Sequence, residues 1–405
     1  MIDLRPFRAW RPVPHAAHLV GSRSFVSYTA DQIKEKLAGN PYSFLHIIHP
    51  DGEMPGIDRA GHFDNVRAMF QEFTRKGILE RDHAPALYLY EQSCAAFTSR
   101  GIIGAVGVGD YIEGRVKRHE HTLSHREELF TDYLDHTAIN AEPVLLAMPE
   151  SPALEAEMDA FFQLPTLFDF LTTDQVRHRF WRVDSLPHLA TFRAHFNSME
   201  ALYIADGHHR CASSVRLAGK HGAEAGSPKS AFLAFLVPAS QLHIYNYDRV
   251  VKGLHGLSPD AFLERLRHIG PMHELPDGPG TPAGGHVQVL LQGRWYDLEL
   301  APPATPSAAE TLEAARLNEQ VLGPVLGITD LRTDPRVHFV PGTLGPQACE
   351  RLLHQGKADV AFHLRPLTFG ELRAVADSGA CMPPKTTWIE PKLRSGLTIY
   401  PLNDV

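Results

Sequence analysis

The chain has 405 residues and a formal net charge of -8 at pH 7, so it is long enough for two or three domains around a large core. The negative balance argues against general nucleic-acid binding by bulk charge, although it leaves room for a local basic pocket that takes a phosphorylated metabolite. The four cysteines lie far apart without a paired-cysteine motif, which argues against a disulfide framework or a zinc ribbon and suits a reducing cytoplasm.

Residues 1–110 are expected to form an N-terminal α/β region. Cations alternate with aromatic residues over 5–12, which predicts an ordered arm held by its aromatic rings, or an arm whose arginines reach an anionic site. No apolar signal segment opens the chain, and no apolar run is long enough to span a bilayer. Hydrophobic periodicity and capping residues predict helices over 29–38 and 63–73, and strands over 44–49, 86–92 and 102–108.

Residues 111–275 are expected to form the core region of the protein. Ser124 and Glu127 have the spacing of a capping box, which predicts a helix that starts there and buries Phe130, Tyr133 and Leu134. Further strands are predicted over 144–147, 166–170, 176–183, 231–237 and 242–247, and further helices over 154–162 and 189–196.

Residues 276–405 are expected to form a C-terminal α/β region that begins with a Pro/Gly-rich loop over 276–285. Strands and helices are mixed along the whole chain without an internal repeat, which predicts the α+β class. In this last region a hairpin is predicted over 287–291 and 295–300, helices over 308–322 and 368–376, and a strand over 360–364.

The most informative stretch covers residues 202–219. Its first four residues are apolar or aromatic and predict a buried strand. The Asp-Gly pair at 206–207 predicts a sharp turn, because glycine adopts backbone angles that other residues resist. A helix is predicted from His208 to Gly219. Its buried face would comprise Cys211, Val215 and Ala218.

This turn concentrates side chains that suit an anion. A helix that starts directly after a strand presents backbone N–H groups and the positive end of its dipole to a phosphate. We expect Asp206 to hold a metal ion or a ribose hydroxyl, and His208, His209 and Arg210 to contact phosphate oxygens. The alternative is that Asp206 caps the helix, one histidine packs in the core and Arg210 is a surface charge. A zinc site is not expected, because neighbouring helix residues point about 100° apart.

Two other segments carry groups that suit the same chemistry. Glu120 follows two cations and His119, and such a carboxylate would serve as a general base if it lies in a cleft. The alternative is an exposed charged loop. Near the C-terminus two prolines precede Lys385 and Thr386, and Lys392 follows. These three residues would line a pocket for phosphate or carboxylate, unless the segment is a stiff, solvated tail.

The motifs occur in a fixed order along the chain. Lys-Arg-His-Glu at 117–120 precedes Asp-Gly-His-His-Arg at 206–210, and Met-Pro-x-Lys-x-Thr at 382–387 follows. Arg-Pro-Phe-Arg stands at 5–8 and Asn-Pro-x-x-Phe-Leu-His at 40–46. With this set the chain resembles, over nearly its whole length, a family of uncharacterised prokaryotic proteins catalogued as domain of unknown function ten-fifteen.

That family is similar to proteins of the ParB/sulfiredoxin-like fold, so the resemblance implies a ParB/sulfiredoxin-like core with N- and C-terminal α/β extensions. Within this fold, the ADP-dependent free serine kinase carries a similar His-Glu and a similar Asp-Gly-His-His-Arg in the same order. The resemblance implies that Glu120 is the base for the acceptor hydroxyl. The catalytic residues expected are Glu120, His119 and His209. The nucleotide-binding residues expected are Asp206, Gly207, His208, Arg210, Lys385, Thr386 and Lys392.

These expectations favour a nucleotide-dependent phosphotransferase that acts on the hydroxyl of a small amino or hydroxy acid, with ATP or ADP and a Mg²⁺ ion that bridges the phosphates. One alternative is a non-catalytic nucleotide-binding regulator of the ParB-like type. Another is a histidine-rich metallohydrolase, which would carry stoichiometric transition metal. We expect a cytoplasmic protein whose partners are a nucleotide and a small substrate rather than a membrane or a nucleic acid, with a homodimer left open.

Overall fold

The computed structural model describes residues 1–49, 58–304 and 306–403. Its contacts define two compact units, each assembled from segments that are distant in the sequence. The first unit comprises Met1–Lys117, Thr122–Leu242 and Pro391–Val405, and the second comprises Arg118–His121 and His243–Glu390. The division into 1–110, 111–275 and 276–405 stays a prediction.

Both units contain helices and strands, so the α+β class is confirmed. The predicted strand and helix on either side of the Asp-Gly turn are both present. Among the described helices, none is long and apolar enough to cross a membrane.

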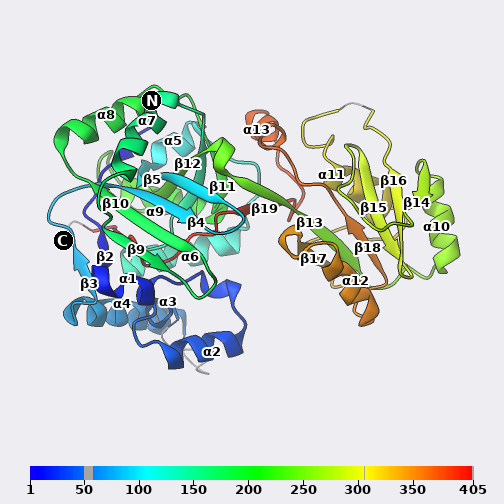
Figure 1. The fold of residues 1–405 in the computed structure, drawn as a ribbon, viewed down its shortest axis with the longest axis horizontal. Helices are drawn as coiled ribbons and strands as arrows, with labels where there is room; N and C mark the ends of the chain where they lie inside the picture. Colours follow the sequence, from blue (N-terminus) through cyan, green and yellow to red (C-terminus); the bar gives the residue numbers. More distant parts are fainter. Residues whose placement is uncertain (50–57, 305, 404–405) are drawn as a thin grey trace. The chain divides into compact units, whose positions relative to one another are not determined.

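A mixed sheet forms the centre of the first unit (Figure 1). Its strand order is β6-β11-β8-β12-β5-β4-β10-β9, with β1 added beside β5. The strands β8 and β12 run parallel to each other and are buried along their whole length, as expected for apolar strands with neighbours on both sides. The bounds are β1 Leu4–Arg5, β4 Leu87–Ser93, β5 Thr98–Gly107, β6 Val116–Lys117, β8 Val144–Met148, β9 Phe168–Leu171, β10 Arg177–Val183, β11 Leu202–Asp206 and β12 Ala231–Pro238.

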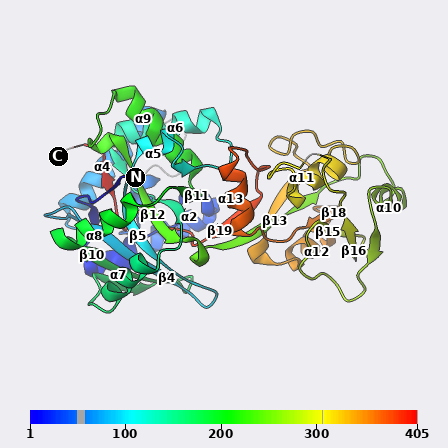
Figure 2. The ribbon, with the colours of Figure 1, turned by 90° about the horizontal axis from the view of Figure 1, so that it is seen from above.

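Helices pack against this sheet and against one another. The helix α6 lies beside α9 (Figure 2), where the Ser213 hydroxyl donates to the carbonyl of Glu127 at 3.1 Å. Two short strand pairs complete the unit: β2 Trp10–Pro12 with β3 Leu79–Arg81, and β7 Ile139–Asn140 with β20 Tyr400–Pro401. The helices are α1 Ala17–Val20, α2 Ala30–Gly39, α3 Leu45–Ile48, α4 Arg59–Arg75, α5 Val108–Ile112, α6 Ser124–Thr137, α7 Pro152–Phe162, α8 Leu186–Asn197 and α9 His208–His221.

The main core of the first unit lies between the sheet and the helices α7, α8 and α9. Phe192 and Phe196 of α8 are buried there against apolar side chains of the sheet. The face of α9 predicted to be buried contributes as expected, because Cys211 and Ala218 are buried and Val215 packs against them.

The last part of the chain returns to the first unit as an extended segment, residues 391–399, which we call the C-terminal strap. Ser395 exchanges backbone hydrogen bonds with Ser22, and Ile399 does so with Trp10. The N–H of Gly396 donates to the carbonyl of Ala141 at 3.1 Å. The strap is therefore fixed to segments from the first 141 residues of the chain.

The second unit is built on an antiparallel sheet with the order β14-β16-β15-β18-β13-β17, and β19 also pairs with β13. The hairpin of β15 and β16 and the loop before it are as predicted. The bounds are β13 His243–Val251, α10 Pro259–Arg267, β14 Met272–Glu274, β15 His286–Leu291, β16 Arg294–Glu299, α11 Glu313–Leu317, β17 Val337–Pro341, α12 Gln347–His354, β18 Val360–His363, α13 Phe369–Asp377 and β19 Thr387–Glu390.

One predicted strand is wrong. Residues 45–48 form the single helical turn α3 instead of part of a strand over 44–49. Its side chains Leu45 and Ile47 are buried, and α3 packs on α4. A short apolar run has no periodicity that separates a strand from a buried turn of helix, so its contacts decided the outcome.

Several predicted helix ends also differ from the structure. Ser124 is the first residue of α6 and caps nothing, while Glu127 accepts a hydrogen bond from the Thr122 hydroxyl. The helix α9 continues past Gly219 to His221, and its C-cap is Gly222, which has the left-handed φ of 55° that favours glycine. The helix predicted over 308–322 begins only at Glu313 and ends in a π-helical turn.

The buried face of α6 differs from the predicted one. Leu134 is buried as expected and Tyr133 packs at the edge of a core cluster, but the Phe130 side chain is 37% exposed. Thr131 and Thr137 are buried in its place, and each donates its hydroxyl to a carbonyl one turn earlier in the helix. A threonine whose hydroxyl is bonded within its own helix can be buried at a helix interface. A pattern of hydrophobic residues alone does not identify such positions.

Candidate functional site

The strand–turn–helix unit at 202–221 is confirmed. Leu202 pairs with Val116 of β6, and Tyr203 pairs with Ala147 of β8, so β11 is held from both sides. The strand ends at Asp206, and Gly207 is the N-cap of α9 with φ 102° and ψ 28°. A residue with a side chain rarely adopts a positive φ of this size, so the turn requires glycine.

Gly207 also makes room for a neighbouring side chain. A Cβ atom at this position would lie 2.9 Å from Nε of Arg210, which is closer than carbon and nitrogen atoms pack. The Arg210 side chain therefore folds back over the turn because residue 207 has no side chain.

Arg210 ties the turn to two other parts of the first unit. Its Nη2 contacts Oδ2 of Asp206 at 2.9 Å, and its Nη1 contacts Oε1 of Glu142 at 2.9 Å and donates to the carbonyl of Pro143 at 2.6 Å. Burial lowers the pKa of Arg210, but the charges of Glu142 and Asp206 outweigh it and the pKa is raised. Arg210 is thus a fixed cation that sets the position of the Asp206 carboxylate.

Lys392 of the strap reaches the same carboxylate. Its Nζ lies 3.8 Å from Oδ1 of Asp206, and the two side chains are 29% and 42% exposed. Each oxygen of Asp206 therefore faces one cation, and this ion pair is open to solvent. The structure places Lys392 beside the turn although 185 residues separate the two positions in the sequence.

The two histidines of the turn have different surroundings. His208 is buried. Nε2 of His209 accepts a hydrogen bond from the backbone N–H of Leu123 at 3.1 Å, just before α6 begins. An imidazole nitrogen that accepts a hydrogen bond carries no proton, so the neutral ring of His209 holds its proton on Nδ1.

The start of α9 is electrostatically positive. The helix has 14 residues, and its first turn contains no acidic side chain. Its basic residues Lys220 and His221 stand in the last turn, where they complement the negative end of the dipole. The first turn together with Lys392 therefore favours a negatively charged ligand.

The other expected residues belong to the second unit. The carbonyl of the buried His119 accepts the N–H of Met382 at 2.8 Å, which joins the segment 118–121 to the segment around 382. Glu120 is half-buried. Burial raises the pKa of the Cys381 thiol, and the charge of Glu120 raises it further. Glu120 therefore lies near residue 381 within this unit.

Lys385 and Thr386 follow in the same segment. The Lys385 ammonium lies 5.3 Å from the centre of the Tyr247 ring, a cation–π distance. Its backbone has the left-handed φ of 55°. Thr386 is buried, and its hydroxyl donates to the carbonyl of Pro383 at 2.7 Å. Thr386 therefore closes the turn that presents Lys385.

The expected residues thus fall into two groups by unit. The first unit holds Asp206, Gly207, His208, His209, Arg210 and Lys392, and the second holds His119, Glu120, Lys385 and Thr386. Sequence reasoning missed Glu142 and Leu123, which fix Arg210 and His209. Neither stands in a recognisable motif, so no signal in the sequence identified them.

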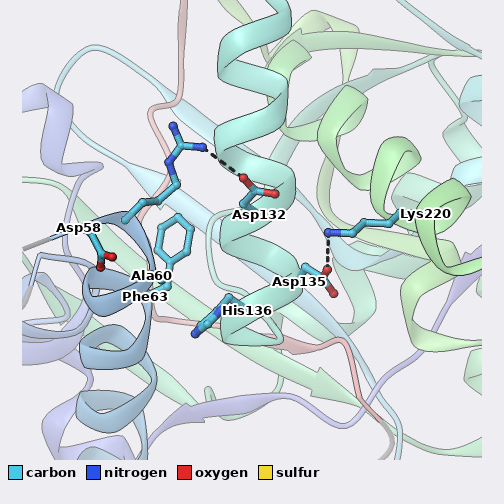
Figure 3. A pocket seen from close by; sticks show the side chains of 8 residues that line it. Asp58, Ala60, Phe63, Asp132, Asp135, His136 and Lys220 are labelled. Carbon is cyan, nitrogen blue, oxygen red and sulfur yellow. Dashed lines mark hydrogen bonds and ion pairs between the residues drawn. The ribbon is translucent and has the colours of Figure 1, made fainter.

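A cavity of about 660 Å³ lies elsewhere in the first unit, among α4, α6 and α9. Four of its charged groups form two ion pairs: Arg59 contacts Asp132 at 3.2 Å, and Lys220 contacts Asp135 at 2.9 Å (Figure 3). None of the expected site residues lines it. Among the residues that the structure describes, no group of three or more histidine, cysteine or carboxylate side chains is arranged to hold a metal ion.

The model of the family described as "Protein of unknown function (DUF1015)" matches residues 4–321. The chain belongs to this family. The resemblance found in the motifs is therefore confirmed at the level of the family. The matched region of this DUF1015 protein includes Glu120 and the turn at 206–210, and it ends before Lys392.

Several solved structures are similar to this DUF1015 protein. Free serine kinase in complex with AMP is 15% identical with a TM-score of 0.38, and covers 73% of this chain and 90% of its own. A variant of that kinase in complex with ADP is 15% identical with a TM-score of 0.39, and covers 73% and 91%. SbnI with a C-terminal truncation, from Staphylococcus aureus, is 15% identical with a TM-score of 0.40, and covers 74% and 87%. No curated protein matches the chain.

Proposed function

We propose that the turn between β11 and α9 binds the phosphate groups of a nucleotide, and that this protein transfers a phosphoryl group to the hydroxyl of a small amino or hydroxy acid. The observation that supports this most is the meeting of Lys392 with Asp206 and Arg210 at the N-terminus of a 14-residue helix. Phosphoryl transfer depends on positioning the phosphates and on neutralising their charge. The cations and the helix N-terminus at this turn would serve both purposes.

Lys392 is the cation best suited to contact the phosphates. Its distance of 3.8 Å from Asp206 is longer than a close ion pair, and its side chain is partly exposed. A phosphate oxygen would join this ammonium at the start of α9, where the helix dipole adds to the attraction. Arg210 acts differently, because Glu142, Pro143 and Asp206 hold its guanidinium and make it the support of the turn.

The turn also has a group that fits Mg²⁺. This ion prefers carboxylate oxygens and the phosphates of its nucleotide, and Asp206 is a partly exposed carboxylate beside the proposed phosphate site. When bound, the ion would neutralise the negative charge of the phosphates. Asp206 would hold it, and Arg210 would keep Asp206 in position.

In the transfer step, the hydroxyl oxygen of the acceptor forms a bond to the terminal phosphorus while the bond from that phosphorus to the remaining nucleotide breaks. The hydroxyl proton passes to the carboxylate of Glu120, a role that rests on the family motif. His119 precedes this base. His209, whose neutral ring carries its proton on Nδ1, would donate a hydrogen bond to the transferred group.

Other expectations stay predictions. Lys385 and Thr386 are expected to bind phosphate, and residues 111–275 are expected to form a ParB/sulfiredoxin-like core. His208, which is buried, is likewise expected to contact phosphate oxygens. A cytoplasmic location and a homodimer also stay predictions.

The test is a comparison of nucleotide binding and turnover. The protein is titrated with ATP and ADP with and without Mg²⁺ while its melting temperature is followed, because a ligand of the native state raises it. Turnover is then measured with a panel of small hydroxyl-bearing acids. Glu120→Gln is expected to lower kcat by at least about 100-fold, as for loss of a general base, while nucleotide binding stays unchanged.

Glu128→Gln is the matched control, because Glu128 is an exposed carboxylate that contacts Arg216. This variant should leave nucleotide binding and turnover unchanged. Saturable nucleotide binding without transfer to any acceptor would favour the non-catalytic regulator. Absence of any nucleotide-induced shift would contradict the proposal as a whole.

A further inference from the structure

We propose that Gln92 is a positioning residue that fixes the backbone of Lys392 and thereby sets the affinity of the turn for its anionic ligand. This inference rests on the proposed function, because it assigns a role to a residue that supports the same site. Gln92 lies on β4, far from the site motifs in sequence, and contacts the strap instead of the turn.

The argument begins with a chain of buried hydrogen bonds. Nε2 of Gln92 donates to the carbonyl of Lys392 at 3.2 Å. Oε1 of the same amide accepts the hydroxyl of Tyr90 at 3.0 Å, and that hydroxyl lies 2.6 Å from Nδ1 of His178. All three side chains of this network are buried, with His178 fully inaccessible.

The chemistry of these groups sets the direction of each hydrogen bond. A tyrosine hydroxyl has one hydrogen, and in this network it goes to Oε1 of Gln92. The neutral imidazole of His178 then donates its Nδ1 hydrogen to the Tyr90 oxygen. Burial lowers the pKa of His178 to about 3, so the ring is neutral at physiological pH. Because Oε1 is directed to Tyr90, the amide must present its N–H₂ group to Lys392.

The network is held on rigid elements. Gln92 and His178 face each other across the antiparallel pair of β4 and β10. The Tyr90 ring stacks on Phe180 at 4.2 Å between centroids, and His178 stacks on Phe170 at 5.1 Å. A donor on such a support has little freedom, so it can fix the main chain that it contacts.

A second contact fixes the strap two residues further on. Nη2 of the buried Arg394 contacts both oxygens of Asp174, at 2.7 and 2.8 Å, in the turn between β9 and β10. The main chain of Lys392 is thus held at its own carbonyl and at residue 394. The position of its ammonium then depends on the side chain alone, which spans from this anchor to Asp206.

A purely structural role for Gln92 makes a different prediction from a positioning role. If Gln92 only stabilises the fold, its loss lowers the melting temperature without acting through Lys392. If Gln92 positions Lys392, its effect on affinity disappears once the lysine is removed, because groups that act as a unit are not additive.

The test is a double-mutant cycle on the full chain with Gln92→Met, Lys392→Met and the double variant. Dissociation constants for Mg²⁺–ADP and Mg²⁺–ATP are measured by calorimetry, together with the melting temperature. We expect Lys392→Met to weaken binding about tenfold, as for loss of one charged contact. Gln92→Met should weaken it about three- to fivefold, and the double variant should bind like Lys392→Met.

Gln241→Met is the matched control. Oε1 of Gln241 accepts the backbone N–H of Arg100 at 2.6 Å in the same unit, so this change removes an amide–backbone contact that is not made to Lys392. It should change the melting temperature without changing affinity. If Gln92→Met folds poorly, Tyr90→Phe is the substitute test. It removes one hydroxyl from the network and should weaken affinity in the same way, but by less than Gln92→Met.

The outcomes separate the two proposals. If the wild type binds neither nucleotide, or if Lys392→Met binds like the wild type, the proposed phosphate site itself is wrong. If Lys392→Met weakens binding but Gln92→Met and Tyr90→Phe do not, only the positioning role is wrong. An equal loss from Gln92→Met with and without Lys392 would also overturn that role.

Discussion

At the scale of single residues, Gly207 determines how charge is arranged at the turn. Its positive φ lets the chain pass from β11 into α9, and its missing side chain lets Arg210 fold over the turn onto Asp206. One glycine thus serves both the backbone and the salt bridges around it.

Gly207→Ala should therefore impair both stability and ligand binding. An alanine at φ 102° is strained by about 1–2 kcal/mol, and its Cβ displaces the Arg210 guanidinium. We expect a lower free energy of unfolding in urea and weaker nucleotide binding in the same variant.

Gly226→Ala is the control for backbone strain. Gly226 has a similar φ of 92°, but a Cβ there meets nothing within 4 Å. This variant should lose stability without losing affinity. If both variants bind nucleotide like the wild type, the position of Arg210 does not matter for binding.

The sequence predicted this turn well but not its partners. An Asp-Gly pair between an apolar run and a helical pattern is a local signal, and the turn followed from it. The contacts of Arg210 with Glu142, and of Gln92 with Lys392, join segments that are distant along the chain. Such pairings depend on how the strands are ordered in the sheet, which no local pattern contains.

At the scale of elements, the strand pair β4–β10 carries a buried histidine with a consequence for acid stability. Burial is the main cause that lowers the pKa of His178 from 6.5 to about 3. Below about pH 6.5 the unfolded chain takes up a proton that the folded chain excludes. Folding stability must then fall as the pH drops from 6.5 towards 3, and His178 contributes no pH dependence above this window.

His178→Phe should flatten this part of the pH profile. The histidine contributes a slope of at most about 1.4 kcal/mol per pH unit, which the variant lacks. Urea unfolding of both proteins at pH 7, 6 and 5 measures the two slopes independently of any constant loss of stability. Parallel profiles would mean that His178 is protonated in the folded protein.

The errors in the predicted elements also have a common cause. The capping box of Thr29 and Gln32 and that of Thr368 and Glu371 were predicted and are present, because each is local. Ser124 and Glu127 have the same spacing, but Glu127 bonds with Thr122 instead. Spacing alone does not tell which of two nearby hydroxyls a carboxylate accepts from.

At the scale of the whole molecule, each unit has its own apolar core. Phe262 of α10 is fully buried in the core of the second unit, together with strands β15 and β16. Removal of a buried phenylalanine side chain leaves a cavity and costs about 3–5 kcal/mol. This loss of stability should first increase local opening among the residues that share that core.

Phe262→Ala should therefore raise hydrogen exchange in the second unit more than in the first. The measurement is deuterium uptake followed by mass spectrometry, with peptides from β15 and β16 compared with peptides from β11 and α9. An equal rise in both sets would show that the two units open together.

The position of Lys392 in the chain has a consequence for biosynthesis. Translation proceeds from the N-terminus, so Asp206 and α9 leave the ribosome long before the lysine that pairs with this carboxylate. A nascent chain that has folded its first 242 residues still lacks this ammonium, and so does any product cut short before residue 391. The ion pair at Asp206 therefore forms only after translation has passed residue 392.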